Sequence, residues 1–184
     1  MRNLYCILLG IVLFSCNPYE GYNYTHYYIQ AELIPDSAYF SANVQMVFVA
    51  RKEYHDSICF DLNPAVKIHS LASQELEHYL FSEYQAGKLV LYIEDAVQLN
   101  DQLHISLSYS GRLHEQGITS LDSSYAWYPH NEETQPFTYQ AKFALPGNWQ
   151  ISHPETGTGQ HGKWLLESPE PLQSLKIKFT LSQL

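Results

Sequence analysis

Basic residues are scarce in this chain. It carries ten Lys plus Arg against nineteen Asp plus Glu, which gives a net charge of −9. The only adjacent basic pair is Arg51-Lys52, so the sequence offers no basic patch. Because an acidic surface repels phosphate groups, the composition argues against nucleic acid as a partner. The 184 residues, 45% of them hydrophobic, are the length and core content of one domain.

Catalytic motifs are also missing. Nine histidines make a metal search worthwhile, but the nearest approach to HExxH is His114-Glu115, with Ile118 where the second histidine must lie. His153 and His161 flank a glycine-rich segment, and two histidines alone do not make a metal site. No G-x-S-x-G nucleophile turn occurs. We therefore predict no catalytic residue, no metal, no cofactor and no enzyme activity of the chain itself.

Cysteine is too rare for a disulfide framework. Of the three cysteines, Cys6 and Cys16 lie in the N-terminal segment. The third, Cys59, lies in the apolar run SICFDL and is predicted to be a small core residue and not a nucleophile.

The N-terminus has the layout of an export signal. Arg2 precedes an apolar run from Leu4 to Phe14, which is shorter than the roughly 20 residues of a membrane span. The run ends in LFSC, which resembles a bacterial lipobox. The resemblance implies cleavage before Cys16, a lipid on its sulfur, and a membrane anchor through that lipid. The alternative is an ordinary cleaved signal with an incidental cysteine.

Most of the remaining chain follows the two-residue period of β-strands. In LHISLSYSG, the apolar residues Leu103, Ile105, Leu107 and Tyr109 alternate with polar ones. The same alternation runs through 137–145 and 175–182. One dry face and one wet face are typical of antiparallel sheets.

Turn signals separate these runs at intervals of about ten residues. SQELEHYLF is predicted to be a strand that enters a hairpin turning at Gln85 to Lys88. The sequence therefore predicts an all-β, antiparallel, saddle-like β-sandwich of roughly 8–10 strands. The expected organisation is a signal peptide over 1–15, a tether over 16–26 and the β-sandwich over 27–184.

The stretch YAWYPHN gathers three aromatic residues, a proline and a histidine. Where the chain leaves one sheet for the next strand, we expect Trp127 to fill the core. Tyr128 and His130 alternate to the other side, so they are expected to be exposed. With Tyr125 they are the candidate ligand-binding residues, since exposed aromatics give a large rigid contact area.

The order of these segments resembles a known family. An opening strand pair over 27–50 is followed by SICFDL, a hairpin, LNDQLHISLSYSGRL, a WYP triplet, another strand and PGNW. This resembles the N-terminal saddle-shaped β-domain of the aminopeptidase N and leukotriene hydrolase family of zinc peptidases. In that family a separate catalytic domain supplies HExxH. The resemblance implies the fold, and peptidase activity does not come with it.

Three functions remain open at this point. The first is a non-catalytic, lipid-anchored protein of the bacterial cell envelope, expected at the outer membrane, with a stand-alone β-domain that binds a ligand or serves as an accessory subunit. The second is the β-domain subunit or fragment of a split zinc aminopeptidase, whose catalytic chain would be its protein partner. The third is a carbohydrate-binding module that uses Tyr125, Tyr128 and the tyrosine-rich leader.

Overall fold

The computed structural model describes residues 25–73, 82–93, 95–131, 136–153, 158–160 and 162–181. The described elements are β-strands and two short 3-10 helices. They are β1 (Thr25–Ile34), η1 (Pro35–Ser37), β2 (Tyr39–Val49), β3 (Ser57–Asp61), β4 (Val66–Ser73), β5 (Ser82–Gln85), β6 (Lys88–Tyr92), β7 (Gln102–Arg112), β8 (Ser120–Leu121), η2 (Ser123–Tyr125), β9 (Phe137–Ala144), β10 (Trp149–His153), β11 (Thr158–Gln160), β12 (Lys163–Leu172) and β13 (Ile177–Leu181). Among these residues no helix is long and apolar enough to cross a bilayer.

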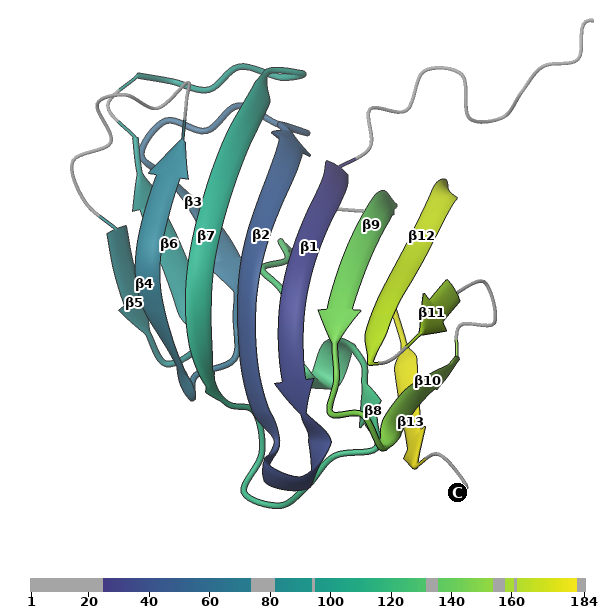
Figure 1. Ribbon diagram of the computed structural model, residues 1–184. Helices are drawn as coiled ribbons and strands as arrows, with labels where there is room; N and C mark the ends of the chain where they lie inside the picture. Colours follow the sequence, from purple (N-terminus) through teal and green to yellow (C-terminus); the bar gives the residue numbers. More distant parts are fainter. Residues whose placement is uncertain are drawn as a thin grey trace, which may run out of the picture.

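The strands form one large sheet and two small ones (Figure 1). The large sheet has seven strands in the order β11-β12-β9-β1-β2-β7-β4. The small sheets have the orders β3-β6-β5 and β10-β13-β8. In Figure 1 the β3-β6-β5 sheet lies behind β4 and β7, and the β10-β13-β8 sheet lies towards the lower end of β9 and β12.

One strand pair departs from the predicted antiparallel pattern. β1 runs antiparallel to β2 but parallel to β9, with Ile29 opposite Ala141. Parallel neighbours require a long crossover connection, and here β2 to β8 lie between the two strands along the chain. The ladder between β1 and β9 therefore joins two halves of the large sheet that are far apart in the sequence.

The core lies between the large sheet and the small ones. Along β1, Tyr27, Ile29, Ala31 and Leu33 are buried while the residues between them are exposed or half-buried. Across the layers, Phe48 of β2 meets Phe60 of β3 edge-on at 5.6 Å between ring centroids. The opposite face of the large sheet, called the outer face below, carries the polar members of the alternation.

The all-β class is confirmed, and the alternation in β7 and β9 is confirmed residue by residue, since Leu103 to Tyr109 and Phe137 to Leu145 bury every second side chain. The hairpin turn is also confirmed, because Gln85 pairs with Lys88. Ala86 and Gly87 both have positive φ there, as a two-residue hairpin turn requires. The residues 74–81, which carry most of the predicted strand SQELEHYLF, lie outside the described part of the chain.

Three details differ from expectation. The described residues form 13 strands and not 8–10, because pieces such as β8 and β11 are only two and three residues long and carry no period. β1 begins at Thr25, two residues before the expected domain start. The alternation over 175–182 predicts that Leu181 is buried with Ile177 and Phe179, but it is 56% exposed as the last residue of β13.

A close approach within the large sheet generates the first prediction. A Cβ on Gly111 of β7 would lie 2.7 Å from the Val66 Cα of the neighbouring β4 and would also overlap the Ala65 carbonyl. Because both are backbone atoms, Gly111→Ala should lower the free energy of unfolding by about 1–3 kcal/mol. Urea unfolding of the purified protein measures this.

Gly147 gives the matched control, since a Cβ there meets nothing within 4 Å. Gly147→Ala should leave the unfolding midpoint nearly unchanged. Equal loss of stability in both variants would contradict the packing described for β4 and β7.

Candidate functional site

The stretch 125–131 forms part of the core. Trp127 has no exposed surface, and its ring meets Phe40 and Phe143 at 5.9 Å each. The buried Tyr109 hydroxyl donates to the Trp127 carbonyl over 2.6 Å. The prediction that Trp127 fills the core is confirmed.

The expected exposure of Tyr128 is wrong. Its side chain is only 4% exposed and lies against the rings of Tyr27 and Phe137. The expectation assumed strand alternation, but the preceding Ala126 has left-handed backbone dihedrals, so successive side chains do not point to opposite sides. Burial raises the pKa of Tyr128 to about 12, while a hydrogen bond with the Leu175 backbone acts in the opposite direction.

The three candidate ligand residues do not share one open surface. Tyr125 is half-buried and packs against the core. The His130 side chain is 31% exposed, with Nε2 lying 3.8 Å from an Asp61 carboxylate oxygen. Tyr128, which separates Tyr125 from His130 in the sequence, is buried. The three side chains therefore contribute to packing and do not form an exposed aromatic surface for a ligand.

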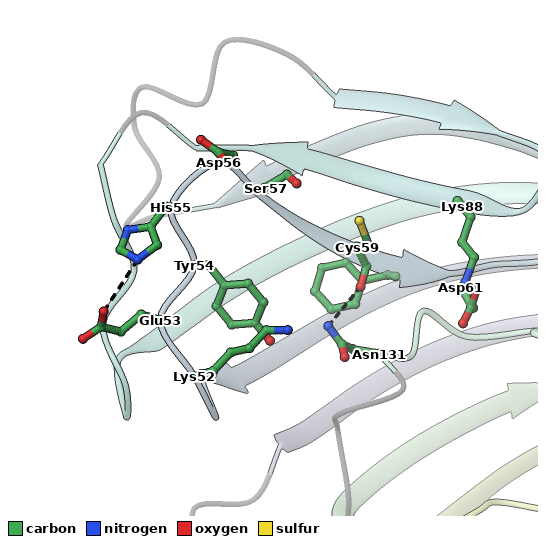
Figure 2. A pocket seen from close by; sticks show the side chains of 11 residues that line it. Lys52, Glu53, Tyr54, His55, Asp56, Ser57, Cys59, Asp61, Lys88 and Asn131 are labelled. Carbon is green, nitrogen blue, oxygen red and sulfur yellow. Dashed lines mark hydrogen bonds and ion pairs between the residues drawn. The ribbon is translucent and has the colours of Figure 1, made fainter.

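A cavity of about 380 Å³ opens beside β3 (Figure 2). Its lining comes from the loop before β3, from β3, from the start of β6 and from the segment after His130. The labelled side chains are Lys52, Glu53, Tyr54, His55, Asp56, Ser57, Cys59, Asp61, Lys88 and Asn131. Five of the lining residues, Lys52, Glu53, Asp56, Asp61 and Lys88, carry a charged side chain.

An ion pair and a histidine–carboxylate contact lie among the residues that line this cavity. Lys88 Nζ lies 2.5 Å from Asp61 Oδ1, and His55 Nε2 lies 3.6 Å from Glu53. The Asn131 amide donates to the Cys59 carbonyl over 3.0 Å and so ties the segment after His130 to β3. These contacts hold the cavity walls together.

Cys59 is exposed, which corrects its predicted place in the core. Its neighbours Ile58 and Phe60 are both buried, so strict alternation turns the Cys59 side chain outward. Within the described ranges its thiol has no hydrogen-bond partner, and no group of three or more His, Cys, Asp or Glu side chains is placed to hold a metal ion.

His114-Glu115 lies in an exposed loop, as predicted, with the histidine close to the backbone of Gln116. His161 and residues 1–24, including Cys16, lie outside the described residues.

Sequence reasoning overlooked the outer face of the large sheet. A second hollow of about 590 Å³ lies there, across β1, β2, β9 and β12. We call it the outer hollow and define it by six side chains. They are Gln30, Glu32, Ser41, Asn43, Lys142 and Lys163. The sequence did indicate these residues, because they are the polar residues that alternate with buried apolar ones along their strands.

Comparison with solved structures identifies the fold. An M1 zinc metallopeptidase from Deinococcus radiodurans matches with a TM-score of 0.65 at 14% identity. The native leukotriene A4 hydrolase of yeast matches with a TM-score of 0.59 at 10% identity. The chain has the fold of a part of M1 zinc metallopeptidases. No family model and no curated protein sequence matches it.

The match is nearly complete for this chain and partial for the other proteins. It covers 83% of this chain but 41% of the Deinococcus enzyme, and 85% of this chain but 28% of the yeast enzyme. This agrees with the predicted resemblance to one β-domain of a larger peptidase. At these identities the likeness concerns the metallopeptidase-like β-domain as a fold and transfers no residue role.

The packing around Trp127 predicts a large stability effect. Trp127→Ala should lower the free energy of unfolding by about 3–5 kcal/mol, because it leaves a cavity among aromatic rings. Trp127→Phe keeps an aromatic ring at this position and should lose less stability. It provides a folded variant to measure if Trp127→Ala does not fold. Guanidinium unfolding measures both.

Leu99 is the control for this pair, as it is 53% exposed. Leu99→Ala should change stability by no more than about 0.5 kcal/mol. A Trp127→Ala variant as stable as Leu99→Ala would show that Trp127 is not a core residue.

The buried tyrosines predict a loss of stability at alkaline pH. Burial raises the pKa of Tyr27 and Tyr109 well above the ordinary 10 and that of Tyr128 to about 12. The folded state therefore holds these protons more tightly than the unfolded chain. The contribution of these protonated tyrosines to the free energy of unfolding is fully present below pH 10. It is lost as the pH rises from 10 towards 12.

Tyr128→Phe removes one of these ionisable hydroxyl groups. The free energy of unfolding of this variant should therefore fall less steeply between pH 10 and 12 than that of the unchanged protein. Urea midpoints at several alkaline pH values, measured for both proteins, test this. Parallel curves would contradict the assignment of Tyr128 as a group that resists ionisation in the folded state.

Proposed function

We propose that this chain is a non-catalytic, lipid-anchored protein of the bacterial cell envelope whose metallopeptidase-like β-domain binds a ligand or serves as an accessory subunit. The observation that carries the proposal is the partial match. The fold corresponds to 41% and 28% of the two peptidase chains, and the printed sequence contains no HExxH motif. Because a fold by itself does not bring an activity with it, the lack of this motif favours binding over peptidase catalysis.

The membrane anchor in this proposal is a lipid on Cys16. Its support is the order of residues in LFSC after a short apolar run. Acyl chains bind bilayers by apolar burial of about 0.8 kcal/mol per methylene group, and two or more chains make the attachment stable. We place the anchor at the outer membrane.

A second candidate is the β-domain subunit of a split zinc aminopeptidase. The same partial match supports it, because the uncovered share of the peptidase chains is where HExxH would be expected. In this case a separate chain carrying HExxH would bind the β-domain and supply catalysis.

One extraction experiment tests both ideas. The protein, tagged after Leu184, is extracted from its native membrane in detergent, separated by size, and analysed by mass spectrometry and with a panel of aminopeptidase substrates. We expect a diacylated Cys16, no peptidase activity of the isolated chain, and membrane release in Cys16→Ser. Cys59→Ser is the control and should stay membrane-bound, because Cys59 lies in the folded domain.

Each outcome separates the candidates. A stoichiometric partner with HExxH and peptidase activity in the complex would favour the split enzyme. An unmodified Cys16 would remove the lipid anchor from the proposal. Activity of the isolated chain would overturn the non-catalytic role.

A further inference from the structure

The outer hollow is built from two rows of side chains that cross four strands. In one row Asn43, Gln30, Lys142 and Leu165 are direct neighbours across β2, β1, β9 and β12. In the next row the neighbours are Ser41, Glu32, Ala144 and Lys163. Three strand spacings give a width of roughly 14 Å. Ala144 contributes only a methyl group, so the rows leave a depression between Glu32 and Lys163.

The two lysines of this hollow lack partners among the described residues. The side chains of Lys142 and Lys163 are exposed and form no ion pair or hydrogen bond with the described residues. They are diagonal neighbours on β9 and β12, which places their Cα atoms roughly 7–8 Å apart. In a chain of net charge −9, two unpaired ammonium groups over one hollow provide a local site for an anionic group.

The other side chains indicate more than an anion. Gln30 and Asn43 offer both donors and acceptors, Ser41 offers a hydroxyl, and Glu32 offers acceptor oxygens only. A dense polyanion would be repelled by Glu32 and by the net charge. The set fits a ligand with many hydroxyl groups and occasional carboxylates, because hydroxyls can donate to Glu32 and accept from the amides.

An exposed aromatic ring lies next to the hollow on the same face. Tyr28 of β1 is 47% exposed and stands two residues before Gln30, hence roughly 7 Å away along the strand. The His26 ring packs edge-on against it at 4.3 Å. His26 is in turn fixed by a 2.6 Å hydrogen bond between Nδ1 and Thr138 Oγ1. Tyr28 is therefore a braced platform on which a sugar ring can lie.

A smaller hollow extends this surface beyond Tyr28. It has a volume of about 130 Å³ and is lined by Tyr28, Gln45, His104 and Ser106, among others. These residues come from β1, β2 and β7, so the polar surface continues across the middle of the sheet. A continuous surface of this length suits an extended chain molecule better than a single ring.

We propose that the outer hollow and Tyr28 bind an acidic oligosaccharide, with Lys142 and Lys163 contacting a sugar carboxylate, Gln30, Asn43 and Glu32 contacting hydroxyls, and Tyr28 stacking on a neighbouring ring. This rests on the proposed binding function and names its ligand class. It also moves the carbohydrate site away from Tyr125 and Tyr128, whose positions form no exposed platform.

Calorimetric titration of the detergent-extracted full protein tests the proposal with three probes. They are a tetramer of three galactose units and one galacturonic acid unit, called the galacturonate tetramer, then the neutral galactose tetramer, and an acidic tetrapeptide. The galacturonate tetramer should bind, more weakly as salt is raised, while the neutral tetramer and the peptide bind more weakly or not at all. The double variant Lys142→Gln/Lys163→Gln should weaken binding of the acidic tetramer about tenfold, and Tyr28→Ala about threefold.

The chain offers a matched control for the charge change. Lys176→Gln/Lys178→Gln removes two exposed lysines near and within β13 and gives the same net charge. Affinity for the galacturonate tetramer should not change in this variant. An equal loss in both double variants would mean that only overall charge matters, and it would overturn the assigned site.

The remaining outcomes are equally decisive. Equal binding of the neutral tetramer would overturn the carboxylate contact, and tighter binding of the acidic peptide would overturn the sugar. No binding of any probe by a protein that is lipidated on Cys16 and inactive as a peptidase would overturn this ligand and leave the proposed function standing. Peptidase activity of the isolated chain would overturn the proposed function whether or not a sugar binds.

Discussion

The parallel ladder between β1 and β9 is the interaction on which the rest of the molecule depends. It pairs Thr25 to Glu32 with Phe137 to Ala144 and so joins the half-sheet β2-β7-β4 to the half-sheet β12-β11. The part of the intervening chain that stays outside this sheet packs on its inner face, and Trp127 lies in that layer against Phe40 and Phe143. The same ladder sets Gln30 beside Lys142, so the core and the outer hollow share one structural cause.

The two faces of the large sheet follow from the same alternation but obey different constraints. Inner-face residues such as Ile29 and Ala141 must fill volume beside close neighbours, and a change of one methylene group is felt there. Outer-face residues such as Gln30 and Lys142 remain in water and are restricted mainly by strand propensity. The inner face can therefore specify the fold while the outer face is free to specify a ligand.

Sequence reasoning reached the local features of this fold and missed its long-range ones. The strands β7 and β9 were predictable because alternation is a local signal, and the Gln85–Lys88 hairpin because its turn is local. The parallel pairing was not, since no local pattern records which distant strand lies beside β1. Tyr128 was misplaced because the left-handed dihedrals at Ala126 break the period, and alanine does not signal such a turn. Cys59 was misplaced because its apolar surroundings outweighed the alternation of SICFDL.

The likeness to zinc metallopeptidases constrains function less than it constrains fold. At 14% and 10% identity what the chains demonstrably share is the strand arrangement, which the buried residues encode. A binding role must be argued from side chains that the core does not require. Lys142 and Lys163 belong to that set, because the described residues give them neither burial nor a partner. They line a hollow that also carries amide, hydroxyl and carboxylate groups, and the proposed sugar site is therefore argued from side chains whose replacement should leave the buried core unchanged.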